Sequence, residues 1–215
     1  MKSLADIFEH TLQDMYYAEN AIAKALPKVA KAAKNAELKK AAEDHLSETK
    51  DQIQKLEQVF KSIGKRASGE KCDAIEGLIK EADGLMKDAE ATALDAGLLA
   101  ACQAVEHYEI ARYGSLREWA KDLGHDEAHT LLSEILDQEK ATNNKLTNLA
   151  VTSINKTSSA RRAAFSISTR PDIPHSLTAR RSISRDWAAV MKRCIEPVGR
   201  GRGQDSNRGS GFARQ

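Results

Sequence analysis

Apolar residues recur three or four positions apart through most of the first 155 residues, which is the spacing of helices with one buried face. The pattern predicts four long helices, at about residues 4–34, 35–64, 91–123 and 126–155, and a shorter helix at 73–87. No segment shows the alternation of apolar and polar residues that marks a strand. The predicted fold class is therefore all-α.

Residues at the predicted helix ends are typical of such positions. Ser3 and Asn35 can cap helix starts with their side chains. Gly64 and Gly124 can take the left-handed conformation that ends a helix. The turns between the first and second long helices and between the third and fourth are short, so each pair is expected to be antiparallel.

The connection between the second and third long helices is much longer. It contains the short helix, which Asp73 opens with Glu76 at the spacing of a capping box. Such a connection can cross the length of a bundle. We therefore expect an antiparallel four-helix bundle with a short extra helix in its crossover.

One carboxylate interrupts the apolar face near the middle of each long helix: Glu19, Glu48, Glu109 and Glu139. Glu109 lies 15 residues before Gly124 and Glu139 lies 15 after it. The other two lie 16 residues before and 13 after Asn35. At ~1.5 Å per residue, all four lie about 20–24 Å from their turns and hence at one level. Four anions in an apolar bundle repel one another unless they are protonated or neutralised, and two divalent metal ions are the economical solution.

The sequence also resembles a known family. The segments YAENAI, HLSETKDQI, VEHYEIARYG and DQEKATNNKLT, in this order within residues 3–155, are similar to the YciE/YciF family of stress-associated bacterial proteins. That family belongs to the ferritin-like, di-iron carboxylate superfamily. The resemblance implies a ferritin-like bundle, a dimer and a dinuclear metal site, without a firmly assigned reaction.

The residues depart from the usual ferritin-like ligand pattern. Glu-x-x-His is expected in the second and fourth helices, but Asp51 follows Glu48 and Thr142 follows Glu139 at that spacing. His45 instead precedes Glu48 by three residues. The predicted metal residues are Glu19, His45, Glu48, Glu106, Glu109 and Glu139. Such an oxygen-rich set suits two divalent ions of iron, or alternatively manganese.

Two of these assignments have open alternatives. Glu106 is either a bridging ligand or a residue at the flank of the buried face. His45 is either a nitrogen ligand or a polar group that orients one. The two tyrosines one turn from the glutamates, Tyr16 and Tyr113, are close enough to donate hydrogen bonds, although packing is the favoured interpretation.

Three classes of function are compatible with this pattern, so enzymatic activity is left open. The first is a di-metal oxidoreductase that reduces oxygen or peroxide with ferrous iron. The second is a metal-sequestering protein without turnover, and the third is a purely structural helical protein. The sequence has no Gly-rich phosphate loop, nucleophile elbow or Cys-x-x-Cys pair that would favour another chemistry.

Charge divides the chain into two parts. Residues 1–155 have 20 basic and 27 acidic side chains, a net charge of −7, whereas residues 156–215 have 13 basic and 4 acidic ones, a net charge of +9. The second part is rich in Arg and poor in large apolar residues, so we predict a disordered tail whose removal leaves thermal stability nearly unchanged. It lacks the interleaved aromatics of many single-strand binders, so nucleic acid is not expected as a partner.

The expected location and assembly follow from the apolar residues. No run approaches the ~18 residues that span a bilayer, and the N-terminus does not resemble a signal peptide, so a cytoplasmic protein without membrane contact is expected. Several apolar or aromatic residues lie off the main stripe: Ile7, Tyr17, Tyr108, Ile110 and Trp119. We expect them under the crossover helix or at the interface of a homodimer.

Overall fold

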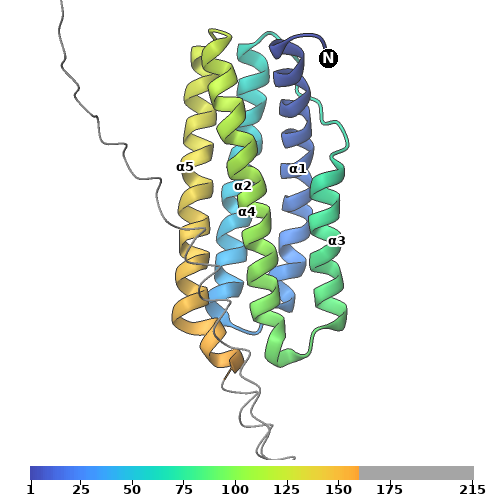
Figure 1. Cartoon of the computed structure of the whole chain (residues 1–215), viewed down its shortest axis with the longest axis vertical. Helices are drawn as coiled ribbons and strands as arrows, with labels where there is room; N and C mark the ends of the chain where they lie inside the picture. The colour runs from blue at the N-terminus through green and yellow to red at the C-terminus, as the bar shows by residue number, and fades with distance from the viewer. Residues whose placement is uncertain (160–215) are drawn as a thin grey trace, which may run out of the picture. The chain divides into compact units, whose positions relative to one another are not determined.

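A computed structural model describes residues 1–159, and nearly all of the predicted tail lies outside this range. The described residues form α1 (Leu4–Ala32), α2 (Ala36–Ser62), α3 (Asp73–Asp88), α4 (Ala91–Asp122) and α5 (Asp126–Leu149), followed by the π-helical turn η1 (Ala150–Ile154) (Figure 1). They contain no strand. The predicted all-α bundle with an extra helix in the crossover is confirmed.

The predicted caps at the starts of α1 and α2 are confirmed. Ser3 Oγ accepts a hydrogen bond from the Asp6 N–H at 3.1 Å, and the Asp6 carboxylate accepts one from the Ser3 N–H at 3.1 Å. Asn35 Oδ1 accepts from two N–H groups of the first turn of α2, at 2.9 and 3.0 Å. Gly64 and Gly124 have φ values of 71° and 72°, which side chains disfavour, and they end α2 and α4 as predicted.

The prediction about the start of α3 was wrong, and the last long helix has a local geometry that was not predicted. Cys72, not Asp73, is the N-cap of α3, and no side chain caps this helix. The Glu76 carboxylate accepts a hydrogen bond from the Tyr17 hydroxyl at 2.7 Å, so it serves the contact between α1 and α3 rather than a capping box. The last long helix stays helical to residue 155 as predicted, but it changes from α to π geometry over Ala150–Ile154. No proline or glycine marks this change in the sequence.

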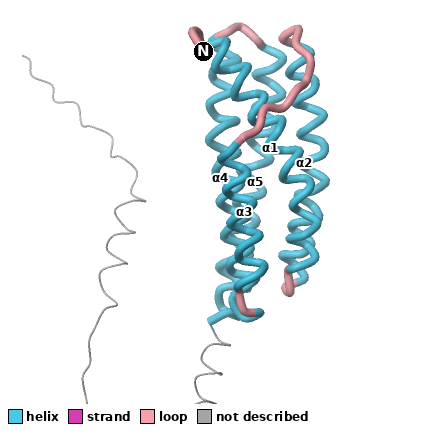
Figure 2. The backbone as a smooth tube through the Cα atoms, turned by 90° about the vertical axis from the view of Figure 1, so that its right-hand side faces the viewer, coloured by secondary structure: helices cyan, strands magenta, loops and turns pink. Residues whose placement is uncertain are grey.

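The four long helices lie side by side, and α3 covers the groove between α1 and α4 (Figure 1). The α2–α3 connection runs along the side of the bundle (Figure 2) and passes close to α1, where a Cβ added at Gly69 would lie 3.2 Å from the Tyr17 Cα. Tyr108 contacts this connection too, since its hydroxyl lies 3.0 Å from Cys72 Sγ. Two of the predicted off-stripe residues, Tyr17 and Tyr108, are therefore used by the crossover.

The buried interior contains apolar layers toward both ends of the bundle and a polar layer between them. The layer near the Gly64 and Gly124 turns consists mainly of Phe8, Leu12, Leu56, Phe60, Leu116 and Leu132. The layer near the opposite end includes Leu26, Val29, Leu38, Leu98, Leu146 and Ile154. Among the described residues, no helix is long and apolar enough to cross a membrane.

Candidate metal centre

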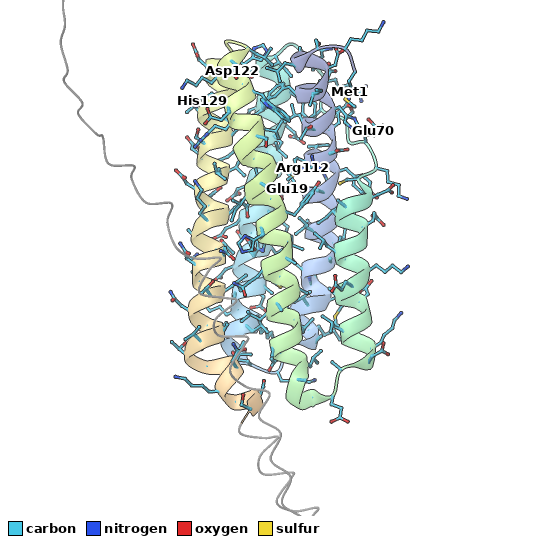
Figure 3. The ribbon with its side chains drawn as sticks, in the orientation of Figure 1. Met1, Glu19, Glu70, Arg112, Asp122 and His129 are labelled. Atoms are coloured by element: carbon cyan, nitrogen blue, oxygen red, sulfur yellow. The ribbon has the colours of Figure 1, made fainter. Side chains whose placement is uncertain are left out.

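The polar layer brings together acidic side chains from three helices and a histidine from the fourth. Glu19 of α1, Glu106 and Glu109 of α4, and Glu139 of α5 are at most 1% exposed, and His45 of α2 is 5% exposed. Glu106 and Glu109 share one face of α4 because they are three residues apart. Figure 3 shows Glu19 well inside the two ends of the bundle.

Four of the predicted metal residues form a compact group. His45, Glu106, Glu109 and Glu139 each offer one ligand atom, and these atoms all lie within 4.8 Å of one another. The Nδ1 of His45 is 3.2 Å from Oε1 of Glu106. The two atoms are not aligned for a hydrogen bond, since neither oxygen of Glu106 has a hydrogen-bond partner among the described residues. From the sequence, Glu106 was either a bridging ligand or a residue at the flank of the buried face. In the structure it is buried within the cluster.

Glu19 adjoins this group without belonging to it. Its carboxylate accepts a hydrogen bond from the hydroxyl of Tyr113, which is fully buried. Glu109 is close enough to Glu19 for the two carboxyl groups to shift each other's pKa. Packing was the favoured role of Tyr113, and the structure adds a hydrogen-bonding role. Tyr16 is not part of the site, because its hydroxyl donates to Glu57 at 3.0 Å.

Glu48 differs from the other predicted metal residues because it is partly exposed and has hydrogen-bond partners. Its side chain is 29% exposed and accepts hydrogen bonds from Thr142 Oγ1 at 2.9 Å and from Lys145 Nζ at 3.4 Å. Both of these partners belong to α5. Glu48 therefore faces the seam between α2 and α5 instead of joining the cluster.

Gln52 is a buried member of the site that the sequence argument did not assign. Its Nε2 donates to Oε1 of Glu139 at 2.6 Å, and its side chain is 1% exposed. Gln52 lies seven residues after His45, which is two helical turns, so both share one face of α2. That spacing was the available signal, but the sequence could not show which carboxylate the amide would contact.

The site contains many buried polar atoms without a partner. Among the described residues, no hydrogen bond reaches either oxygen of Glu106 or Glu109, Oε2 of Glu19 or Glu139, or Nε2 of His45. Each such atom costs free energy when it is removed from water. This set of convergent oxygens and one imidazole nitrogen fits divalent cations, which would supply the missing partners.

Burial and mutual repulsion shift the ionisation of these groups. Burial, followed by repulsion from Glu139, raises the pKa of Glu19 to about 8 and that of Glu106 to about 10, and moves the pKa of Glu109 well above its ordinary value. Burial also raises the pKa of Glu139 to about 7. Burial lowers the pKa of His45 to about 4, so its imidazole is neutral at pH 7 and keeps a lone pair for a metal ion.

Known proteins match almost the whole described part of the chain. Residues 3–159 match a family model described as a domain of unknown function, DUF892. Protein YciF of Escherichia coli strain K12 is 46% identical over 158 residues, covering 73% of this chain and 95% of YciF.

Solved structures give the same result. The crystal structure of the E. coli stress protein YciF matches with 45% identity and a TM-score of 0.70, covering 73% of this chain and 99% of that one. YcfI from Rhodopseudomonas palustris, for which a structural role has been suggested, has 50% identity and a TM-score of 0.66, over 68% and 94% of the two chains. A protein from Xanthomonas campestris, 22% identical with a TM-score of 0.55 over 77% and 98% of the chains, shares the fold. The chain therefore belongs to the DUF892 family and is a relative of the stress protein YciF.

Proposed function

We propose that this protein is a dinuclear metal protein that binds two divalent ions, iron in the first place and manganese as the alternative metal. Its metal residues are Glu19, His45, Glu48, Glu106, Glu109 and Glu139. The observation that carries the proposal is the convergence of four buried carboxyl groups and a neutral imidazole whose free atoms have no partner among the described residues. Two divalent ions balance the charge of four buried carboxylates, so they remove both the repulsion and the missing contacts.

The chain's own residues hold the ligand atoms in place. Gln52 fixes one oxygen of Glu139, and the Tyr113 hydroxyl fixes one oxygen of Glu19, which leaves the other oxygen of each free. Thr142 and Lys145 hold Glu48 at the edge of the site, from which rotation of its side chain would bring it to a metal. Partners of this kind orient carboxylates toward a metal.

The proposed reaction is the reduction of oxygen or peroxide in a stress response, the setting named for YciF. Two ferrous ions held by these residues would supply two electrons, enough to reduce dioxygen to hydrogen peroxide or hydrogen peroxide to water with protons from the solvent. The alternative is a protein that sequesters metal, or has only a structural role as suggested for the R. palustris relative. Bound iron separates the structural alternative from the other two, and oxidation of that iron by peroxide or oxygen separates turnover from storage.

The test is iron binding by the full chain under anaerobic conditions, followed by metal analysis after exchange. Wild type is expected to retain about two ferrous ions per chain, the number set by the charge argument. Glu109→Gln and Glu139→Gln are expected to lose most of this iron and to remain folded without metal, because each removes one source of repulsion. Glu57→Gln, at an exposed position of α2, is the matched control. Equal iron in all four proteins, or none in any, would replace the di-metal function with the structural one.

A homodimer is the proposed assembly. Ile7 is 39% exposed, and Ile110 and Trp119 are only partly buried, so these apolar side chains are available for a second copy. Sedimentation at micromolar concentration is expected to show a dimer. A monomer at all such concentrations would remove this proposal without affecting the metal site.

A further inference from the structure

An apolar pocket leads from the surface toward the metal centre between α1, α3 and α4. Its walls include Ile22 and Ala25 of α1, Ile79 of α3, and Leu98 and Ala101 of α4. It lies where α3 covers the α1–α4 groove. The pocket is therefore a product of the crossover helix, and α3 supplies one of its walls.

The inner end of this pocket is a residue of the metal centre. His45, the contribution of α2, lines the pocket, and its Nε2 has no hydrogen-bond partner among the described residues. Val105 and Cys102 lie on the same wall, next to Glu106 in the sequence or one helical turn before it. Burial raises the pKa of the Cys102 thiol to about 12, so this side chain is uncharged at pH 7 and adds no ion to the wall.

The outer end is marked by Asp83 of α3. Its side chain is 37% exposed, and its carboxylate lies 3.9 Å from Lys28 Nζ of α1. Asp83 is the one charged side chain on the pocket lining, and it is at the solvent side. Charged groups are thus confined to the mouth, and the path from there to His45 is apolar.

The size of the pocket limits what it can hold. A volume of about 40 Å³ is open to the centre of a water-sized molecule. That is more than the ~10–15 Å³ that one such molecule needs. An apolar space of this kind offers water few hydrogen bonds, so it stays dry and binds small apolar molecules such as xenon. An ion or a polar solute would lose its hydration without compensation.

The opposite side of the metal centre has a different character. A larger groove between α2 and α5, about 350 Å³ by the same measure, is lined by Glu48, Lys40, Asp44 and Lys145 together with Thr142. The two approaches to the centre are thus chemically distinct. The α2–α5 groove offers charged and polar side chains to polar molecules. The α1–α3–α4 pocket is lined by apolar side chains and favours small apolar molecules.

We propose that the apolar pocket binds dioxygen and delivers it to the metal centre at His45, by a route that hydrogen peroxide does not use. This inference rests on the proposed function and names its substrate. Dioxygen forms no strong hydrogen bonds in water and enters an apolar pocket at little cost. Hydrogen peroxide has two O–H donors, which would be unpaired there.

The first experiment needs no metal. The full-length apo-protein is exposed to xenon, and the site is located by xenon-dependent shifts of methyl NMR signals or by anomalous scattering from pressurised crystals. Xenon is expected between α1, α3 and α4, with the methyl groups of Ile22, Ala25 and Leu98 affected. Ala101→Leu fills the pocket from α4 and should abolish this binding, whereas Ala104→Leu, on the exposed face of the same helix, should not. Ala25→Leu repeats the blockade from α1 should Ala101→Leu fail to fold.

The second experiment uses the iron-loaded protein. Ferrous oxidation is followed by stopped flow at low dissolved dioxygen, and separately with hydrogen peroxide under anaerobic conditions. The blocked variant is expected to bind as much iron as wild type and to react roughly tenfold more slowly with dioxygen, the usual size of a steric effect in an apolar pocket. Its reaction with peroxide should be unchanged.

The outcomes distinguish this inference from the proposed function. A wild-type protein that takes up no xenon, or a blocked variant that oxidises at the wild-type rate, overturns the pocket's role even when iron binds. Slowing by the same factor with both oxidants also overturns it, because the substitution would then act on the metal centre. Xenon binding without any iron binding would remove the proposed function and leave an apolar ligand site of unassigned use.

Discussion

The polar middle of the bundle and its apolar end near Gly124 are built from the same helices but have opposite effects on stability. At the apolar end, Phe8, Leu12, Leu116 and Leu132 are at most 2% exposed, and the area they remove from water favours folding. In the middle, the carboxyl groups are buried as completely, but most of their oxygens have no hydrogen-bond partner among the described residues. Equal burial thus stabilises one layer and destabilises the other.

This difference separates the layers that stabilise the fold from the layer that contains the candidate metal site. A layer that costs stability persists only if the rest of the bundle compensates for it. The apolar layers on both sides of the site provide that compensation. Mutations at the apolar end should therefore destabilise the protein, and those in the middle should change metal binding before they change the fold.

The largest effect on stability is expected at Leu116. This side chain is fully buried in the apolar end, and Leu116→Ala should lower the free energy of unfolding by about 3 kcal/mol because it removes buried methyl groups and leaves a cavity. Iron binding should be unchanged at temperatures where the variant is folded. Chemical denaturation of the apo-protein, with metal analysis in parallel, measures both quantities. A variant that loses iron while keeping its stability would contradict the division into two regions.

A smaller effect is expected from pH, and it isolates the middle layer. The pKa of Glu19 is about 8 and that of Glu106 about 10 in the folded protein, compared with an ordinary value of 4.5. Between the ordinary and the folded pKa, the folded state retains protons that the unfolded chain has released, so stability falls as pH rises. His45 has the opposite effect, but only between its folded pKa of about 4 and its ordinary value of 6.5.

The window from pH 6.5 to 8 is therefore governed by the glutamates. The apo-protein should lose stability there, measured as a fall in Tm between pH 6.5 and pH 8. Glu109→Gln should flatten this dependence because it removes one of the interacting acids. Bound divalent metal should oppose it, since metal displaces the same protons. A Tm of the apo-protein that stays constant or rises over this window would show that the carboxyl groups are not buried as described.

The fold was predictable from the sequence because its signals are local. The predicted ends of α1, α2 and α4 lie within two residues of the observed ones. They were marked by the caps at Ser3 and Asn35 and by the glycines at 64 and 124. Where a side chain had two possible partners, the local signal failed. Glu76 matched a capping box in sequence, but Tyr17 of a distant segment is its partner. The π-helical turn after Leu149 had no local signal at all.

The sequence predicted which helices contribute residues to the candidate site, but not the direction in which each side chain points. Distance from a turn gave the common level of the four carboxylates, because helical rise is regular. It could not give the direction of each side chain around the helix at a bundle seam. Glu48 and His45 both lie on the inner half of α2, yet His45 reaches the cluster and Glu48 contacts Thr142. The support from Gln52 and Tyr113 depends on contacts across 87 and 94 residues of chain, which no spacing rule supplies.

The smallest effect on stability is expected at Glu48, on the border of the two environments. The Glu48→Gln substitution removes the charge that faces Lys145 across 3.4 Å at a partly exposed position, which should change stability by only about 0.5 kcal/mol or less. The amide oxygen can still accept the hydrogen bond from Thr142. If Glu48 turns inward to bind a metal, the same variant should nevertheless lose bound iron, and Thr142→Val, which removes only the hydroxyl support, should lose less. Metal analysis beside Tm measurements on both variants and on Glu57→Gln decides the point. If Glu48→Gln binds as much iron as wild type, the ligands are restricted to the five buried residues. Replacing a carboxylate ligand by a neutral amide would weaken metal binding.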